Sequence, residues 1–544
     1  MDGLGISLEK VTRRRGFDPI LPVILIVAVF LLFFQLDQRP FWQDEAETAC
    51  LAKNVLKYGL PYAFDGKNLI SQEEGREFAD GDYLWRWSPW LQIYLHAASY
   101  YIFGPTTFAG RFPFALSGLL TILMTYVLIR RRFDDVAWAR ASASLLTLWV
   151  PFLLYARQGR YYAVGALLTV LSLYAFRGKW GSRVGPALLL VFSLALLFYA
   201  NYLLFLSFCA AIFLAALILY FRELRPARTM ILGALTAALA VPGVLVSRMG
   251  QQTGMMDLGK FSDGLESYLT DVGVFMLPLP LALYLALRWG SAPFRGRLDR
   301  RDPGERFVLF LVVILAINIL VLALVPQVFN RYLAHLYPVA AMICGWVAVK
   351  AWRFQKATGA LLFVLLGFTN YLHVLPMDWL GWVNRPWHTA FNMLNYPDIP
   401  LRLHLTETTS DLGDVNRCAI DFFRENAGRD DVVFANYGDL PLMFYTDLQV
   451  LGGLQGRVPP DDHPPDWVLK RPFLTLSRER FFMRADEYLY NKLDLEQDYE
   501  PIVLACPAEM WGARADPYAH RFLPVQEPFR RLTVYRKIKR EGGK

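Results

Sequence analysis

Apolar runs of about 17 to 20 residues dominate the sequence, separated by short charged or turn-rich segments. A helix of this length crosses the hydrocarbon core of a bilayer, because each residue adds ~1.5 Å to the helix and the core is ~30 Å thick. Of the 544 residues, 55% are hydrophobic and only 19% are charged, which excludes a disordered chain and argues against an ordinary soluble enzyme. We therefore predict a polytopic α-helical membrane protein.

The apolar runs and the charges between them predict eleven spans. They are Ile20–Leu36, Phe112–Ile129, Arg140–Ala156, Tyr161–Phe176, Gly185–Ala200, Leu203–Tyr220, Thr229–Ser247, Asp271–Arg288, Phe307–Val325, Leu333–Val349 and Ala357–Leu375. A further apolar stretch, Pro89 to Gly104, is predicted to lie along the outer interface. Counting it as a span would place Arg130–Arg132 outside and Arg13–Arg15 inside, against the positive-inside rule. The N-terminus is then cytoplasmic, and everything after Leu375 lies on the outer face.

Two regions outside the membrane follow from this topology, a large first loop over residues 37–111 and a tail over residues 376–544. The tail contains strand-like runs at Asp431–Ala435 and Tyr499–Leu504 and a helix-like stretch at Arg417–Asn426, with proline-rich turns between them. We predict a transmembrane domain over residues 1–375 and a small α/β domain on the outer face over residues 376–544.

Charge and cysteine placement exclude several other classes of protein. The net charge of +8 lies between apolar runs, where it sets topology, so no nucleic-acid partner is predicted. The five cysteines contain no Cys-x-x-Cys pair, and a Cys418–Cys506 bridge is left open. The seven histidines show no metal-ligand spacing, so no metal site is predicted, although assistance by a divalent cation is left open.

The segment from Trp42 to Ala49 places carboxylates directly after the first span, at the outer membrane surface. It continues as a predicted helix to Tyr58, ended by Gly59. Two interpretations are about equally supported: Asp44 caps this helix with Glu47 as its capping-box partner, or the carboxylates carry chemistry.

Aromatic and basic residues near the outer surface are further candidates. Each has a structural alternative, an interfacial aromatic belt or an arginine that snorkels to the interface. A guanidinium is nevertheless well shaped to hold a phosphate by two parallel hydrogen bonds. The candidates for phosphate are Arg86, Arg157, Arg160, Arg331 and Tyr332, and those for a sugar or acceptor are Asp82, Tyr83, Trp87 and Tyr161.

The order of these motifs resembles the GT-C superfamily of membrane glycosyltransferases, specifically bacterial relatives of protein O-mannosyltransferase and of the aminoarabinose transferase that acts on lipid A. The resemblance covers about Ile20 to Leu375. The segments that carry it are Asp44-Glu45-Ala46, Ser88 to Leu95 running on to Phe103-Gly104, Ala109 to Pro113, Tyr155 to Ala163, and Arg331-Tyr332 with Pro338. Many relatives carry Lys-Pro-Pro-Leu where this chain has Trp87-Ser88-Pro89-Trp90, so the lysine is absent here and Arg86 lies one position earlier.

The resemblance implies that Asp44 is the base that activates an acceptor hydroxyl while a sugar leaves a polyprenyl phosphate with inversion. Glu45 projects in a different direction from its neighbour and would orient the site or bind the acceptor. We therefore expect an inverting glycosyltransferase at the periplasmic face of a bacterial inner membrane, with lipid A, a cell-surface glycan or a protein as acceptor. The alternatives are en bloc transfer or polymerisation of a lipid-linked glycan, or a non-catalytic lipid-glycan transporter.

Overall fold

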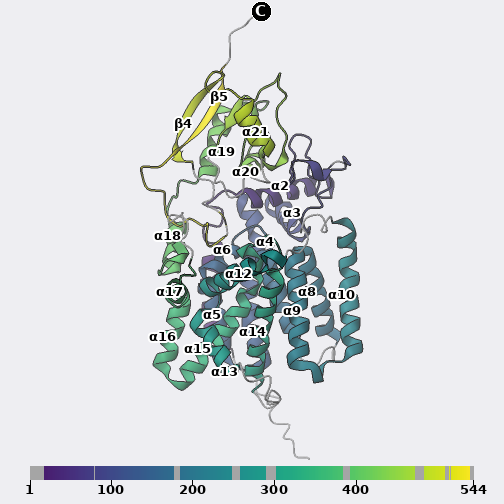
Figure 1. The fold of residues 1–544 in the computed structure, drawn as a ribbon, viewed down its shortest axis with the longest axis vertical. Helices are drawn as coiled ribbons and strands as arrows, with labels where there is room; N and C mark the ends of the chain where they lie inside the picture. The colour runs from purple at the N-terminus through teal and green to yellow at the C-terminus, as the bar shows by residue number, and fades with distance from the viewer. Residues whose placement is uncertain are drawn as a thin grey trace, which may run out of the picture.

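The computed structural model describes residues 17–78, 80–176, 184–247, 258–289, 302–383, 393–471, 483–508, 514 and 516–538. A bundle of long helices forms the lower part of the molecule, and an α/β unit made by the C-terminal third lies above it (Figure 1). Helices α2 (Gln43–Tyr58) and α3 (Leu91–Phe103) lie between the two parts (Figure 1). The basic segment Arg13–Arg15 lies outside the described residues.

Each predicted span overlaps a helix of the bundle. Five helical segments are long and apolar enough to cross a membrane: α4 (Thr107–Phe133), α9 with the turn η3 (Tyr202–Glu223), α10 (Pro226–Val246), α14 (Pro303–Leu322), and the turn η7 with α15 (Asn330–Phe354). Three bent pairs raise this number to eight, namely α5 (Val136–Leu148) with α6 (Val150–Ala156), η4–α12 (Leu258–Phe275) with α13 (Leu279–Trp289), and α16 (Lys356–Gly367) with α17 (Tyr371–Trp379). The predicted class, a polytopic helical membrane protein, is confirmed.

The total of eleven spans stays a prediction, because three of the matching helices are short. These are α1 (Ile20–Phe33), α7 (Tyr162–Ala175) and α8 (Val184–Ala200), of 14 to 17 residues. Helix α3 has 13 residues, too few to cross a bilayer unaided. Its last turn exposes Tyr101, Ile102 and Phe103, which suits the predicted place along an interface.

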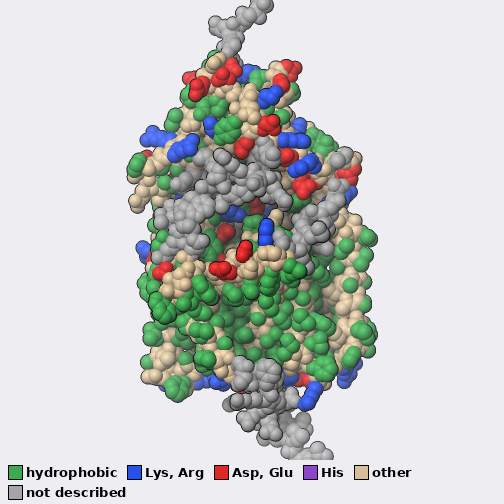
Figure 2. Space-filling view, in the orientation of Figure 1, with side chains coloured by type: hydrophobic (Ala, Val, Ile, Leu, Met, Phe, Trp, Pro, Cys, Tyr) green, Lys and Arg blue, Asp and Glu red, His purple; other side chains and the backbone are tan. Residues whose placement is uncertain are grey.

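Basic side chains gather at one end of the bundle, below a broad apolar belt (Figure 2). Arg130, Arg131 and Arg132 form the last turn of α4, and Arg353 near the end of α15 pairs with Asp135. A band of arginines at one rim of an apolar belt is the pattern that the positive-inside rule describes for the cytoplasmic face.

The C-terminal part contains one five-stranded sheet in the order β2-β1-β3-β5-β4. Strands β1 (Val432–Ala435), β2 (Gln449–Gly452) and β3 (Trp467–Leu469) are parallel, and β4 (Tyr499–Pro507) and β5 (Arg531–Lys537) complete the sheet with antiparallel pairings. The parallel step from β1 to β2 runs through α20 (Asp439–Tyr445), as a parallel connection requires a crossover. Helix α18 (Pro400–Thr409) packs on the helical bundle, whereas α19 (Val415–Asn426) and α21 (Met483–Asn491) complete the α/β unit. Both predicted strands and the predicted helix are confirmed.

The first loop and the C-terminal unit share one hydrophobic core, which the division at residue 375 did not anticipate. Helix α20 packs on α2, and the rings of Phe41 and Phe444 lie 5.1 Å apart at this junction. A second attachment lies near the chain end, where Phe522 is buried in the core of the helical bundle and the Tyr518 hydroxyl donates to Asp271. The C-terminal part of the chain therefore packs on both the first loop and the membrane helices.

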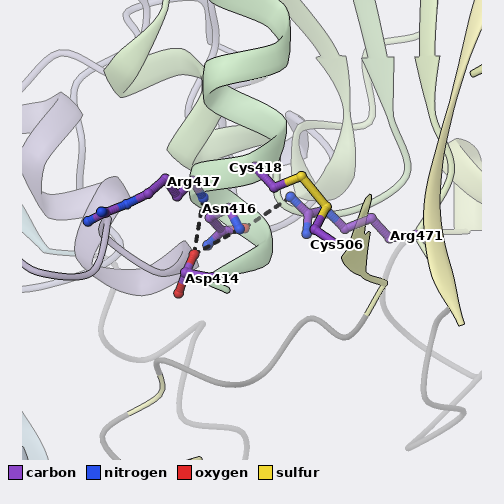
Figure 3. Close-up of a disulfide and its surroundings, with 6 residues drawn as sticks. All are labelled: Asp414, Asn416, Arg417, Cys418, Arg471 and Cys506. Carbon is purple, nitrogen blue, oxygen red and sulfur yellow. Dashed lines mark hydrogen bonds between the residues drawn. A yellow bond between two sulfur atoms is a disulfide. The ribbon is translucent and has the colours of Figure 1, made fainter. Parts of the chain in front are cut away.

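A disulfide joins Cys418 in α19 to Cys506 in β4 (Figure 3). Because the bond closes a chain separation of 88 residues, it removes many conformations from the unfolded chain. We expect Cys418→Ser to lower the free energy of unfolding of this unit by about 2–4 kcal/mol. The measurement is the rate of limited proteolysis under non-reducing conditions, with Cys209→Ala, which removes a free thiol, as control. Equal proteolysis of both variants would show that the disulfide adds no stability.

Candidate functional site

The centre of the candidate site is an ion pair between Asp44 and Arg331. Asp44 lies in the first turn of α2, and Arg331 lies in the 3-10 turn η7, which leads into α15. Arg331 Nη1 donates to Asp44 Oδ2 over 2.8 Å, and about a quarter of each side chain is exposed, 24% for Asp44 and 23% for Arg331. The pair is therefore ordered but accessible. Figure 2 shows a recess above the apolar belt with acidic and basic side chains inside it.

The capping-box interpretation of Asp44 and Glu47 is wrong. The N-cap of α2 is Trp42, and no side chain caps this helix end. Asp44 instead pairs with Arg331, and Glu47 pairs with Arg160. Both acids point to arginines from other elements because tertiary contacts outweigh a local cap. The predicted end of the helix at Tyr58, with Gly59 in the left-handed region at φ +79°, is confirmed.

Glu45 is fully buried and forms a bidentate ion pair with Arg111 of α4. The two contacts, Arg111 Nε to Oε1 and Nη2 to Oε2, measure 2.8 and 2.6 Å. Glu45 Oε1 also accepts the backbone N–H of Gly159, where an added Cβ would lie 2.6 Å from His96 Nε2. Arg111 further donates to the carbonyls of Leu36 and Arg39. Glu45 therefore ties α2 to α4 and to the loop before α7.

Arg160 supports the same helix from the other side. Its Nη1 donates to the Asp44 carbonyl over 2.9 Å, to Glu47 Oε1 over 3.0 Å and to Thr48 Oγ1 over 2.8 Å. Burial raises the pKa of Glu47, and the coulombic effect of Arg160 opposes that shift. Arg160 is thus engaged with the first turn of α2 and holds Asp44 in place.

The other arginine candidates lie in different surroundings. Arg157 donates from Nη1 and Nη2 to the carbonyls of Leu31 and Gln35, at the end of α1, a typical interaction of an arginine at a helix C-terminus. Arg86 pairs with Asp82 and lines an apolar cavity beside the junction of α8 and α9 and the end of α10. The structure does not bring Arg86 and Asp82 into the contacts around Asp44.

Aromatic residues surround the central ion pair. The rings of Tyr161 and Tyr162 lie 4.7 Å apart, and both side chains are buried. The Arg331 guanidinium lies 4.2 Å from the centre of the Phe329 ring and 6.0 Å from that of Tyr332. Tyr83 instead packs beside Phe64 and Phe78, and Trp87 packs on the core shared with the C-terminal unit. Of the predicted sugar-binding residues, Tyr161 directly follows Arg160, which contacts the first turn of α2.

The C-terminal unit contributes residues to this region that the sequence interpretation missed. Tyr437 and Arg514 line a cavity together with Trp42 and Gln43, the two residues before Asp44. Burial is the main cause that raises the pKa of Tyr437 far above its ordinary value, and the negative charge of Asp44 adds to the shift. No sequence signal links either residue to α2, whereas Arg111 could have been suspected as a charge in the second turn of a long apolar helix.

Among the residues that the structure describes, no group of three or more His, Cys, Asp or Glu side chains is placed to hold a metal ion.

Arg331 and Arg157 can be tested against each other by conservative substitution. Lysine keeps the charge but loses the planar fork that holds a phosphate by two hydrogen bonds. We expect Arg331→Lys to weaken binding of a polyprenyl-phosphate sugar about tenfold, the effect of one lost charged hydrogen bond. Arg157→Lys is expected to lower the thermal midpoint and leave donor affinity unchanged, because Arg157 donates to carbonyls of α1. Donor affinity that falls in Arg157→Lys alone would reverse these assignments.

The overall arrangement is that of a known fold. No protein-family model and no curated protein sequence matches this chain. Among solved structures, it is similar to ArnT from Cupriavidus metallidurans in the apo state, with 15% identity, 95% of this chain and 97% of ArnT covered, and a TM-score of 0.52. The structure of the same protein bound to undecaprenyl phosphate matches with 14% identity, 95% and 98% coverage and a TM-score of 0.51. The predicted GT-C fold is therefore confirmed over nearly the whole chain.

A weaker likeness is found to the oligosaccharyltransferase of Archaeoglobus fulgidus in complex with zinc and sulfate. The identity is 15%, the coverage 83% of this chain and 68% of the other, and the TM-score 0.45.

Proposed function

We propose that this protein is an inverting glycosyltransferase that moves a sugar from a polyprenyl-phosphate carrier to an acceptor hydroxyl. The observation that carries this proposal is the accessible Asp44–Arg331 pair, held by buried contacts on both sides. The GT-C fold supports it, since the similar ArnT has been crystallised with undecaprenyl phosphate.

In the proposed reaction, the acceptor oxygen attacks the anomeric carbon while the bond from that carbon to the phosphate oxygen breaks. Asp44 takes the acceptor proton, and the polyprenyl phosphate leaves with the bonding electron pair. A phosphate is a weak base, so it needs cationic stabilisation and no general acid. Arg331 is suited to supply that charge. As the donor phosphate takes over the guanidinium, the carboxylate of Asp44 is released from its ion pair.

We further propose that the recess faces the periplasm. The Cys418–Cys506 disulfide supports this placement, because disulfides persist in the periplasm and are rare in the cytosol. The arginine-rich rim at the opposite end of the bundle fits the cytoplasmic side (Figure 2).

A panel of labelled polyprenyl-phosphate sugars, incubated with membranes that contain or lack the protein, tests the proposed class. Consumption of one donor with release of polyprenyl phosphate and a labelled product would support the transferase and identify the sugar. Consumption of no donor in the panel, while pyrophosphate-linked oligosaccharides are transferred, would favour en bloc transfer instead.

A further inference from the structure

Asp271 is a buried carboxylate that contacts the turn carrying Arg331. It lies on α12, which belongs to one of the bent helix pairs of the bundle, and only 4% of its surface is exposed. A carboxylate in such a place costs free energy unless it has hydrogen-bond partners. The Tyr518 hydroxyl donates to Asp271 Oδ1 over 2.6 Å, and the side chain of Asn330 bonds to the same carboxylate. Asp271 thus joins the C-terminal part of the chain to the residue directly before Arg331.

The turn η7 and the residue before it are held by two helices. Asn330 is buried, and its Oδ1 accepts the hydroxyl of Tyr155 on α6 over 2.7 Å. Because Oδ1 is the acceptor for Tyr155, the amide nitrogen of Asn330 is the atom that donates to Asp271. The backbone N–H of Phe329 donates to the hydroxyl of Tyr268 over 3.4 Å. Tyr268 lies three residues before Asp271, so both side chains project from one face of α12.

Tyr518 reaches the carboxylate on α12 from an ordered support. Asp516 Oδ1 accepts the backbone N–H of Tyr518 over 3.0 Å, which closes a side-chain turn. The Tyr518 ring packs edge-on against Phe275 of α12, with the ring centres 4.8 Å apart. Four residues further on, Phe522 is fully buried in the core of the helical bundle. The segment around Tyr518 is therefore fixed to the bundle independently of the hydroxyl.

We propose that Tyr518 and Asp271 are positioning residues for Arg331, because through Asn330 they set the place of the backbone that carries its guanidinium. Without the Tyr518 hydroxyl, the buried carboxylate would lose a donor and would turn toward another partner or water. Asn330 would move with the carboxylate, and Arg331 would move with Asn330. The receipt of a donor phosphate by Arg331 rests on the proposed function, whereas the ordering of η7 by Tyr518 does not.

The test combines hydrogen exchange of the η7 peptide with binding of undecaprenyl phosphate, both for the full chain in detergent. We expect Tyr518→Phe to speed exchange in η7. Binding should weaken about fivefold, less than for a charged hydrogen bond lost at Arg331 itself, because Tyr518 acts indirectly. Tyr499→Phe is the matched control, since it also removes a buried hydroxyl, which donates to the Pro465 carbonyl over 2.9 Å within the C-terminal unit. It should leave η7 exchange and binding unchanged.

A combined variant separates positioning of Arg331 from a general loss of stability. Two substitutions that act on one guanidinium do not add, so Tyr518→Phe together with Arg331→Lys should bind undecaprenyl phosphate about as weakly as Arg331→Lys alone. Losses of affinity that multiply in the combined variant would overturn the proposal, as would wild-type exchange and affinity in Tyr518→Phe.

A second variant covers the case in which Tyr518→Phe does not fold. Asp271→Asn leaves one acceptor oxygen for two donors, so it is expected to loosen η7 and weaken binding in the same way. Wild-type η7 exchange in Asp271→Asn would then overturn the proposal. If the wild type binds no undecaprenyl phosphate while either variant speeds exchange in η7, the positioning of the turn holds and the proposed function fails.

Discussion

Asp44→Asn is expected to lower the rate of sugar transfer about 10³-fold, because an amide cannot accept the proton of the acceptor hydroxyl. General-base catalysis contributes about 10²- to 10⁴-fold, which sets the size of the effect. The fold should persist, since the amide oxygen of Asn still accepts the hydrogen bond that Arg331 Nη1 now donates to Asp44 Oδ2. Because the substitution frees Arg331 from an opposite charge, donor affinity should be retained or increase.

The measurement is single-turnover transfer at saturating donor, with donor binding determined separately. Asp461→Asn serves as the matched control, because Asp461 lies exposed in the C-terminal unit in a surface pair with Lys492. Full transfer by Asp44→Asn would show that Asp44 is not the catalytic base. A variant with an unchanged rate at saturating donor but a much weaker donor affinity would instead place Asp44 in substrate binding.

The fold was predictable because its main signals are local. Placing a charge in hydrocarbon costs free energy for each helix separately. The apolar runs and the arginines between them therefore show the membrane spans in the sequence itself. The helix that begins near Asp44 ends at Gly59 for an equally local reason, the left-handed backbone there. The strands of the C-terminal sheet are likewise bounded by turn residues.

The contacts of the site were less predictable because they join distant parts of the chain. Residue spacing placed Glu47 three residues after Asp44, as a capping box requires, but Arg160 of another loop takes its carboxylate. Arg471 lies 427 positions beyond Asp44, and only the folding of the C-terminal unit over α2 brings it to the same region. Contacts between such distant residues depend on how whole helices and strands pack together. No local sequence pattern reveals that packing.

Glu45→Gln should destabilise the protein by about 3–5 kcal/mol, the cost of breaking a buried ion pair by removing one partner. The Arg111 side chain is only 8% exposed, so its charge would be left without a counter-charge in a site that water barely reaches. The backbone turn between α1 and α2, which Arg111 holds through the carbonyls of Leu36 and Arg39, would loosen with it. The measurement is the loss of folded protein on heating in detergent.

Asp134→Asn provides the control, because the Arg130–Asp134 pair is a surface pair, with 68% of the Asp134 side chain exposed, and is worth at most ~0.5 kcal/mol. Asparagine also tolerates the left-handed backbone of that position, φ +55°. A comparison with Asp44→Asn then distinguishes the roles of the two adjacent acids, Asp44 and Glu45. If Glu45 positions the site, its variant loses stability and the folded fraction still transfers sugar. If Glu45→Gln is as stable as the wild type but inactive, Glu45 takes part in the chemistry and its ion pair with Arg111 is not what holds α2.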